Sequence, residues 1–166
     1  MQEKGTRPIQ AKRKWKSIAF INKNKVMKSF TDIEQSKKLT EILPIESADM
    51  HYVRKTYDFM GNPVDGEWSY PKYGNPNSKH ANYIVQNFES YERIPCWSLA
   101  AVLEIIPKCI EDLNRLRIDI DNVDFSIWYD DLNGYGVNDK LPDITLKEPV
   151  DACYEMILKL NEKNLL

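Results

Sequence analysis

Residues 94–107 read IPCWSLAAVLEIIP and form the most apolar stretch of the chain. Ser98 is suited to cap a helix, because its hydroxyl oxygen can accept a hydrogen bond from a free backbone N–H group of the first turn. Four apolar residues follow at the spacing of one helical face, namely Leu99, Val102, Leu103 and Ile106. The pattern predicts a core helix over residues 98–106, with Trp97 just outside it and covering its end.

Two more helices are predicted on either side of this stretch. Thr31 and Glu34 have the spacing of a capping box, which indicates a helix over about 32–43. Pro149 is suited to the first position of a helix over about 149–163. The apolar stripe of that last helix consists of Val150, Cys153, Ile157 and Leu160.

Apolar and polar residues alternate over residues 115–120 and again over 123–129, which predicts a β-hairpin with one buried face. A two-residue turn at positions 121–122 aligns three apolar pairs on that face: Ile120 with Val123, Ile118 with Phe125, and Leu116 with Ile127. On the other face the same register places Arg115 opposite Trp128, a pair suited to a cation–π contact.

The sequence loses its regular period between the first two predicted helices. Residues 50–54 are expected to form a short strand. Glycines and prolines are scattered through residues 57–82, so a long irregular loop is expected there. Its aromatic residues favour packing against the body, or a surface for a ligand or partner; they are Tyr57, Phe59, Trp68, Tyr70 and Tyr73. Residues 83–85 are a candidate strand, and residues 139–145 are interpreted as a loop.

The order of these elements favours an α+β fold, because strands and helices do not alternate as βα units. We predict a small antiparallel sheet, centred on the hairpin, packed against two or three helices. A chain of 166 residues is long enough to bury a core and corresponds to one domain. Residues 27–166 are expected to form that single domain.

The charge of the chain is unevenly distributed. Residues 1–30 contain nine lysines and arginines but one acidic residue, although the net charge of the whole chain is −2. A basic arm on an acidic body is typical of proteins that contact nucleic acid. A disordered tail, or an extension ahead of a start at Met27, is the favoured interpretation of residues 1–26.

The cysteines and the hydropathy of the chain indicate the cellular compartment of the protein. Cys96, Cys109 and Cys153 are an odd number without metal-ligand spacing, so buried free thiols in a reducing cytosol are expected. No apolar run approaches the roughly 20 residues that cross a bilayer, and residues 1–16 are too polar for a secretory signal. We therefore expect a cytoplasmic protein with no membrane partner.

The search for catalytic motifs finds one chemical cluster, which is acidic. Seven aspartates lie in and after the hairpin: Asp119, Asp121, Asp124, Asp130, Asp131, Asp139 and Asp143. Carboxylates at strand ends can hold a divalent cation, but aspartate is also an ordinary turn residue, and a solvated rim is the favoured interpretation. His51 and His80 lack metal-ligand spacing. The sequence predicts no catalytic residue, no cofactor and no metal site.

Three segments carry a resemblance to other proteins. They are SADM at residues 47–50, IPCWSLAAVLE at 94–104 and PVDACYEMILKL at 149–160. In this order they resemble a family of uncharacterised small proteins of Bacteroides-type gut bacteria and their phages and prophages. The resemblance covers residues 27–166 and implies an accessory protein of a mobile element, without implying an activity or catalytic residues.

The favoured function is therefore a non-enzymatic module that binds another protein. The candidate interaction surface consists of Arg115, Trp128, Trp68, Tyr70 and Tyr73. Two alternatives remain open. One is a nucleic-acid-binding module that uses the basic residues 1–30, and the other is a divalent-metal-dependent hydrolase that uses the hairpin carboxylates.

Overall fold

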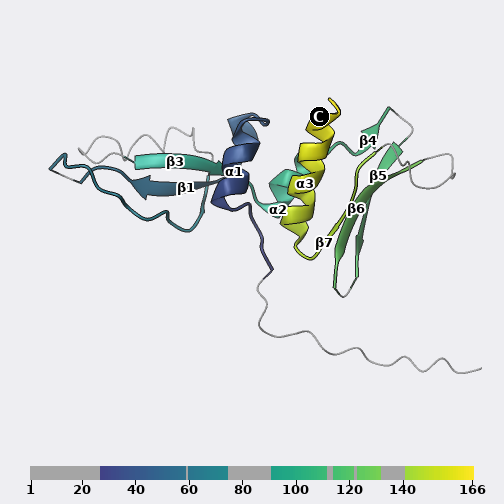
Figure 1. The fold of residues 1–166 in the computed structure, drawn as a ribbon, viewed down its shortest axis with the longest axis horizontal. Helices are drawn as coiled ribbons and strands as arrows, with labels where there is room; N and C mark the ends of the chain where they lie inside the picture. The colour runs from purple at the N-terminus through teal and green to yellow at the C-terminus, as the bar shows by residue number, and fades with distance from the viewer. Residues whose placement is uncertain (1–26, 59, 75–90, 112–113, 122, 132–140) are drawn as a thin grey trace, which may run out of the picture.

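The computed structural model describes residues 27–58, 60–74, 91–111, 114–121, 123–131 and 141–166. Within these ranges the chain forms three α-helices, one short 3-10 helix and two antiparallel sheets of three and four strands. The α+β class is thus confirmed, with a second sheet beyond the one that the sequence predicted. Figure 1 shows one sheet at each end of an elongated molecule, with the helices between them.

The elements follow in this order: α1 (Ile33–Thr40), η1 (Ile45–Ser47), β1 (Met50–Lys55), β2 (Lys72–Tyr73), β3 (Tyr91–Cys96), α2 (Leu99–Ile105), β4 (Cys109–Ile110), β5 (Asn114–Ile120), β6 (Phe125–Asp131), β7 (Asp143–Leu146) and α3 (Pro149–Glu162). The longest helix in the described ranges is α3, with 14 residues. None of the helices described has the length and apolar character needed to cross a membrane.

Helix α1 begins one residue later than the predicted capping box requires. Its cap is Asp32, whose carboxylate accepts a hydrogen bond from the N–H of Gln35, while the Gln35 side chain accepts one from the N–H of Asp32. The predicted capping box of Thr31 and Glu34 was wrong. Thr31 is fully buried, and its hydroxyl forms a hydrogen bond with that of Ser36 instead of capping the helix. The helix also ends at Thr40, earlier than the predicted residue 43.

The first sheet has the strand order β2-β1-β3. The predicted strand at residues 50–54 is confirmed as β1, which pairs with β2 on one side and with β3 on the other. Strand β2 lies inside the predicted irregular stretch 57–82, of which the structure describes residues 57–58 and 60–74. The candidate strand at 83–85 lies outside the described residues.

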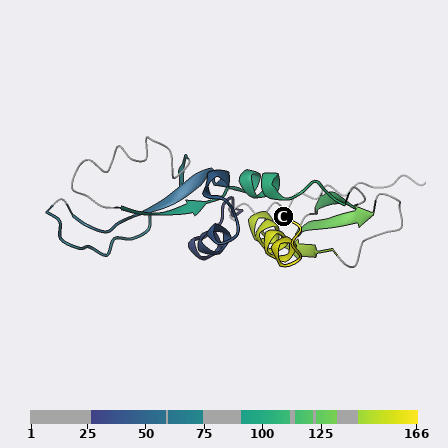
Figure 2. The same ribbon diagram turned by 90° about the horizontal axis from the view of Figure 1, so that it is seen from above.

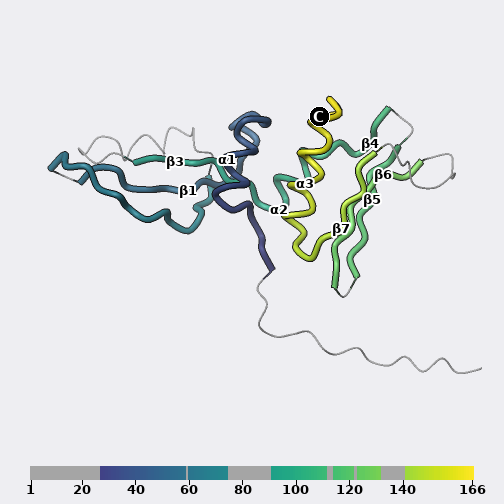
Figure 3. Tube along the Cα trace, in the orientation of Figure 1, coloured from purple at the N-terminus to yellow at the C-terminus, as the bar shows by residue number. Residues whose placement is uncertain are grey.

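The stretch 94–107 turns out to be two elements. Its first three residues complete β3, and the chain then passes directly into α2, as Figure 3 traces. The predicted cap is confirmed, since the Ser98 hydroxyl accepts a hydrogen bond of 3.2 Å from the N–H of Ala101. Trp97 does lie just before the helix, with no exposed surface. However, α2 has only seven residues, so it is one part of the core and not the element on which all others pack.

Helix α3 is the more central element. It starts at Pro149, as predicted, and every residue of the predicted apolar stripe is fully buried. The main hydrophobic core extends from Leu39 in α1 through Trp97 and α2 to α3 and the second sheet. A smaller cluster of four buried residues lies under the first sheet: Met50, Tyr52, Ile94 and Cys96.

The second sheet has the order β4-β5-β6-β7, and its hairpin register differs from the predicted one by two residues. Ile120 lies opposite Phe125, and Ile118 opposite Ile127, so residues 121–124 form the turn. The prediction of a two-residue turn was wrong. The Asp121 carboxylate accepts hydrogen bonds from the N–H groups of Val123 and Asp124, and these bonds stabilise a longer turn. A shift of two residues leaves each side chain on its predicted face.

The interpretation of residues 139–145 as a loop was wrong for the part that the structure describes. Strand β7 (Asp143–Leu146) pairs with β6 and forms an edge of the second sheet. Ile144 is its buried residue, and it lies opposite Ile127. Polar and apolar residues alternate along β7, and burial of Ile144 in the sheet's inner face favours a strand there.

Candidate interaction surface

One face of the second sheet is apolar across three strands. The register places these residues on it: Leu116, Ile118 and Ile120 from β5, Phe125, Ile127 and Tyr129 from β6, and Ile144 and Leu146 from β7. Alternate side chains of a strand point to opposite faces, so this set follows directly from the pairing. Such a face is normally covered by a second layer.

The cover is incomplete. Helix α3 packs against β6 and β7, where Phe125, Ile127, Tyr129 and Ile144 are at most 6% exposed. On β5, by contrast, Ile118 is 43% and Ile120 is 68% exposed, and Leu116 is half-buried. We call Leu116, Ile118 and Ile120 the open half-face. Val123, in the adjoining turn, is 64% exposed and extends this apolar surface.

Helix α2 is too short to cover the rest of β5. Seven residues span about 10 Å of helix, and Figure 2 shows α2 beside α3 between the two sheets. A hollow of about 510 Å³ remains between α2 and β5. Its floor is apolar and its rim carries two cations, since it is lined by Leu103, Lys108, Arg115, Leu116 and Ile118. The Lys108 ammonium also donates a hydrogen bond to the Leu103 carbonyl at the end of α2.

The opposite face of the same sheet is polar, and the residue pairs on it differ from the predicted ones. Arg115 lies opposite Asp130, and Trp128 lies opposite Arg117. The predicted pairing of Arg115 with Trp128 was therefore wrong, because it depended on the two-residue turn. Arg117 donates to a carboxylate oxygen of Asp130 at 3.4 Å, and Trp128 is half-buried.

Trp68, Tyr70 and Tyr73 belong to the part of the chain that carries the first sheet: Tyr73 lies in β2, and Trp68 packs against the buried cluster of β1 and β3. Figure 1 shows that sheet at the other end of the molecule. The Arg54 guanidinium lies 4.9 Å from the centre of the Trp68 ring, which is the cation–π pair in the described structure. Tyr70 packs edge-on against Phe30 at 4.9 Å but is 75% exposed. Tyr73, in β2, is 82% exposed. The five predicted surface residues thus belong to two separate places and do not form one surface.

Sequence reasoning missed Ile118, Ile120 and Val123 as surface residues, because alternation predicted them on a buried face. The signal available was the length of the predicted helices. A helix over 98–106 and one over 149–163 cannot cover a whole sheet face of four strands, but the sequence does not say which strand is left open.

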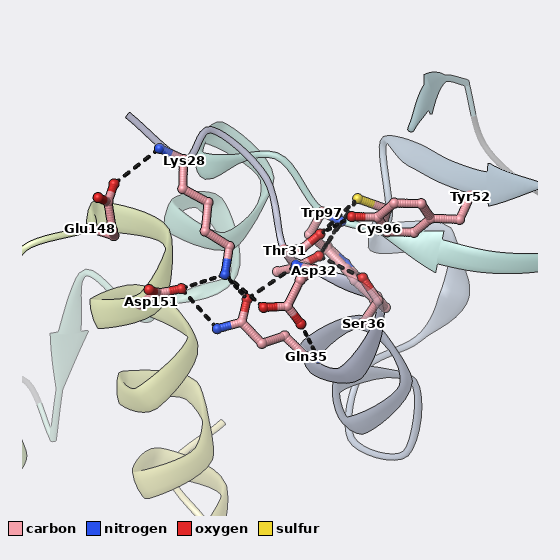
Figure 4. Close-up of polar contacts among 10 residues, drawn as sticks. All are labelled: Lys28, Thr31, Asp32, Gln35, Ser36, Tyr52, Cys96, Trp97, Glu148 and Asp151. Carbon is pink, nitrogen blue, oxygen red and sulfur yellow. Dashed lines mark hydrogen bonds and ion pairs between the residues drawn. The ribbon is translucent and has the colours of Figure 1, made fainter. Parts of the chain in front are cut away.

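A charged junction joins α1 to α3 close to the start of the described chain (Figure 4). The Lys28 ammonium lies 2.6 Å from a carboxylate oxygen of Asp151 and 2.9 Å from one of Asp32. The N–H of Lys28 donates to the Glu148 carboxylate at 3.0 Å. Burial alone would lower the pKa of Lys28, but the hydrogen bonds and charges of Asp151 and Asp32 outweigh it and raise the pKa. The junction holds the two helices together.

A second, buried polar cluster surrounds Thr31 (Figure 4). Its carbonyl oxygen accepts hydrogen bonds from the Tyr52 hydroxyl at 2.7 Å and from the Cys96 thiol at 3.4 Å. Its hydroxyl accepts one from the N–H of Trp97 at 3.1 Å. Burial raises the pKa of the Cys96 thiol, so this sulfur stays protonated at neutral pH and is no nucleophile. The cluster anchors the chain before α1 to β1 and β3.

The segments SADM and IPCWSLAAVLE contact each other. The Asp49 carboxylate accepts hydrogen bonds from the N–H of Ser98 at 2.9 Å and from its hydroxyl at 2.6 Å. The indole N–H of Trp97 donates to the Ser47 hydroxyl at 3.0 Å. Asp151, in the third segment, belongs to the Lys28 junction. The polar side chains of Ser47, Asp49, Ser98 and Asp151 therefore hold helices and strands together.

Two of the hairpin carboxylates, Asp121 and Asp130, have structural partners as well. Hydrogen bonds from the N–H groups of Asp124 and Val123 lower the pKa of Asp121, and Asp130 pairs with Arg117. Among the described residues, no three His, Cys, Asp or Glu side chains are grouped so that they could hold a metal ion. Asp139 and His80 lie outside those residues. The metal-dependent hydrolase remains a prediction that rests on the sequence.

The basic arm, residues 1–26, also lies outside the described residues. Of the nine basic residues in 1–30, Lys28 alone is described, and its charge is already paired with Asp32 and Asp151. Nucleic-acid binding by the arm remains a prediction. Of the three cysteines, Cys96 and Cys153 are buried free thiols, as expected, whereas Cys109 in β4 is exposed.

Comparison of the chain with protein-family models, curated proteins and solved structures found no match. The resemblance to small proteins of Bacteroides-type bacteria and their phages therefore remains a prediction. The candidate site rests on the geometry of the open half-face.

Proposed function

We propose that the chain is a non-enzymatic interaction module that binds another protein through the open half-face. The observation that carries the proposal is the exposure of Ile118 and Ile120 on a sheet face whose strands β6 and β7 pack against α3. Contiguous apolar surface beside a polar rim is typical of protein-binding sites.

The free energy available at this surface supports the proposal. Full burial of an isoleucine side chain is worth about 1.5–3 kcal/mol. The side chains of Ile118 and Ile120 are 43% and 68% exposed in the free chain. A partner that covers both therefore stabilises the complex by about 2–3 kcal/mol through these two residues. Arg115 and Lys108 at the rim add polar contacts that fix the orientation of the partner.

A non-enzymatic role is supported by what the chemically reactive side chains do. The Cys96 thiol, the Asp49 carboxylate and the Asp121 carboxylate are all engaged in hydrogen bonds that hold the fold. We place the module in the cytoplasm, because its three cysteines are free thiols. The sequence resemblance supports an accessory role in a phage or another mobile element.

Photo-crosslinking tests the location of the binding surface. A benzoylphenylalanine in place of Ile120 points outward on the apolar face, whereas the same residue in place of Asp119 points to the opposite, polar face. We expect the Ile120 position to crosslink one protein of the host cell in high yield and the Asp119 position to give little. Equal yields from the two positions would contradict the proposal.

The captured protein is then purified and titrated with the full chain. Ile118→Asp places a charge in the apolar contact, and we expect it to weaken binding by about 100-fold, equivalent to 2.7 kcal/mol. Tyr73→Asp is the matched control, since Tyr73 is 82% exposed on the other sheet. Binding that survives Ile118→Asp and is lost with Tyr73→Asp would move the site to the aromatic residues of the first sheet.

A further inference from the structure

The outer edge of β7 is open in the described part of the chain. Strand β6 pairs with one side of β7, and no strand in that part pairs with the other side. Ile144 is buried, whereas Asp143, Thr145 and Leu146 are exposed. Leu146 is 37% exposed although it lies on the apolar face, next to α3. An edge of this kind is a position at which a further strand can add.

The backbone of β7 points outward at two residues. The N–H of Asp121 donates to the carbonyl of Asp124 at 3.1 Å, so these two residues are a hydrogen-bonded pair of the hairpin. Such pairs alternate with non-bonded pairs along an antiparallel ladder. The odd-numbered residues of β6 therefore direct their N–H and C=O groups to β7, where Ile144 is bonded to one of them. Asp143 and Thr145 consequently present two donors and two acceptors on the outer side of β7.

The described chain begins next to this edge. The N–H of Lys28 donates to the Glu148 carboxylate at 3.0 Å, and Glu148 follows the end of β7 by two residues. Figure 4 shows both residues at the start of α3. A hollow of about 440 Å³ lies at the same place and is lined on one side by residues 145–148. The chain that precedes Lys28 is therefore tethered beside β7.

The basic arm contains one segment that is suited to a strand. Residues 18–21 read IAFI and are the longest apolar run of residues 1–26. Isoleucine and phenylalanine favour strands, and Asn22 bounds the run. Residues 22–27 connect the run to Lys28 and can span about 20 Å when extended. The distance along the chain from Asp143 to Glu148 is about 17 Å in extended form, so the run can reach the whole edge.

The tether favours this segment over a strand from a separate chain. The edge offers two donors and two acceptors, which is few for a free peptide that is held by main-chain hydrogen bonds. A short connection gives the run an effective concentration on the order of millimolar at the edge. Alternate side chains of an added strand lie on the same face, so Ile18 and Phe20 can together cover Leu146 beside α3.

We propose that residues 18–21 add to the outer edge of β7 as a further strand of the second sheet, with Phe20 against Leu146. This strand lies at the opposite edge of the sheet from β5, so it is independent of the proposed function. It makes part of the basic arm a component of the folded domain, and it closes an edge that could otherwise pair with other chains. The competing occupant is the same segment of a second copy.

Hydrogen exchange of the full chain, measured by NMR, tests the proposal at the two outward amides of β7. We expect exchange at Asp143 and Thr145 to be at least about tenfold slower than in an unstructured peptide, as docking in about nine-tenths of the molecules gives. Exchange at both amides as fast as in an unstructured peptide would overturn the proposal.

Two variants of the arm separate docking from any other protection of these amides. Phe20→Asp places a charge in the docked run, and we expect it to return both outward amides to the exchange rate of an unstructured peptide. Ile9→Asp makes the same change outside the run and should leave their exchange slow. The amide of Ile144 is bonded to β6 and should stay slow in both variants, which shows that the sheet is folded. Slow exchange at the outward amides that survives Phe20→Asp would overturn the proposal.

Protein concentration distinguishes the two possible sources of the strand. A strand from the same chain gives protection that is constant over about a hundredfold range of protein concentration, with a monomer in sedimentation. Protection that is lost on dilution, together with a dimer that dissociates over the same range, would assign the strand to a second copy and overturn the intrachain proposal.

Discussion

Three isoleucines lie in one row across the second sheet and allow the open half-face to be tested by stability alone. Ile118 lies opposite Ile127, and Ile127 lies opposite Ile144, all on the apolar face. Their exposures are 43%, 0% and 6%, in that order. The same change, isoleucine to alanine, can therefore be compared at three neighbouring positions that differ mainly in cover.

The expected losses follow from burial. Complete burial of an isoleucine, with the cavity that its truncation leaves, makes Ile→Ala cost about 2–5 kcal/mol. We expect Ile127→Ala and Ile144→Ala to lower the free energy of unfolding by about 3 kcal/mol each. Ile118→Ala removes a side chain that is only about half-buried, so it loses about half of the free energy of full burial and leaves no closed cavity. We therefore expect it to lower the free energy of unfolding by about 1 kcal/mol.

Equilibrium urea unfolding at 25 °C, followed by tryptophan fluorescence, measures these differences. The dependence on urea should stay constant among the variants, so that shifts of the midpoint report stability alone. A loss at Ile118 as large as that at Ile127 would refute the reasoning, because it would mean that Ile118 is covered in the protein in solution. The surface would then be unavailable to a partner.

Three further predictions concern the contacts that hold the fold. Asp49→Ala should lower the free energy of unfolding by about 1–2 kcal/mol, because Ser98 loses both acceptors; a thermal melt that does not move would contradict this. Lys28→Met and Asp151→Asn should show a coupling of about 0.5–1 kcal/mol in a double-mutant cycle, reduced in 1 M salt, because both side chains are partly exposed; independent effects would contradict the junction. Burial raises the pKa of Cys153 from 9.0 to about 12, so between these pH values the unfolded chain loses its thiol proton and the folded chain keeps it. Stability should therefore fall by about 1.4 kcal/mol per pH unit through this group as pH rises. Cys153→Ala should remove this contribution, and identical alkaline slopes would refute it.

The sequence predicted the elements better than their boundaries. The Ser98 cap, the Pro149 start and both hairpin strands came from local chemistry, and the structure confirms them. The cap of α1 was misplaced by one residue, since Thr31 and Asp32 are both good caps. Only the tertiary burial of Thr31 against Trp97 decides between them.

The register of the hairpin and the strand β7 depended on information beyond local pattern. The Asp121 side chain selects the longer turn, and several turn lengths are compatible with the same alternation. Residues 143–146 alternate polar and apolar side chains over only four residues, which is too short a run to indicate a strand by itself, and β7 forms because Ile144 completes the row beside Ile127.

The location of the candidate site was the least predictable feature. Aromatic content singled out Trp68, Tyr70 and Tyr73, but spacing along the chain does not say that this segment accompanies a different sheet from Arg115 and Trp128. The open half-face arises because α3 covers two strands and α2 ends early. Both facts are properties of packing between elements.

The heat capacity change on binding tests the central claim most directly, because burial of apolar surface makes it negative. The titration is made at several temperatures with the captured protein, the unmodified chain and the double variant Ile118→Ala, Ile120→Ala. The open half-face predicts a clearly negative heat capacity change that is smaller in magnitude for the double variant. An identical change for both proteins would contradict the claim that these two side chains are buried by the partner.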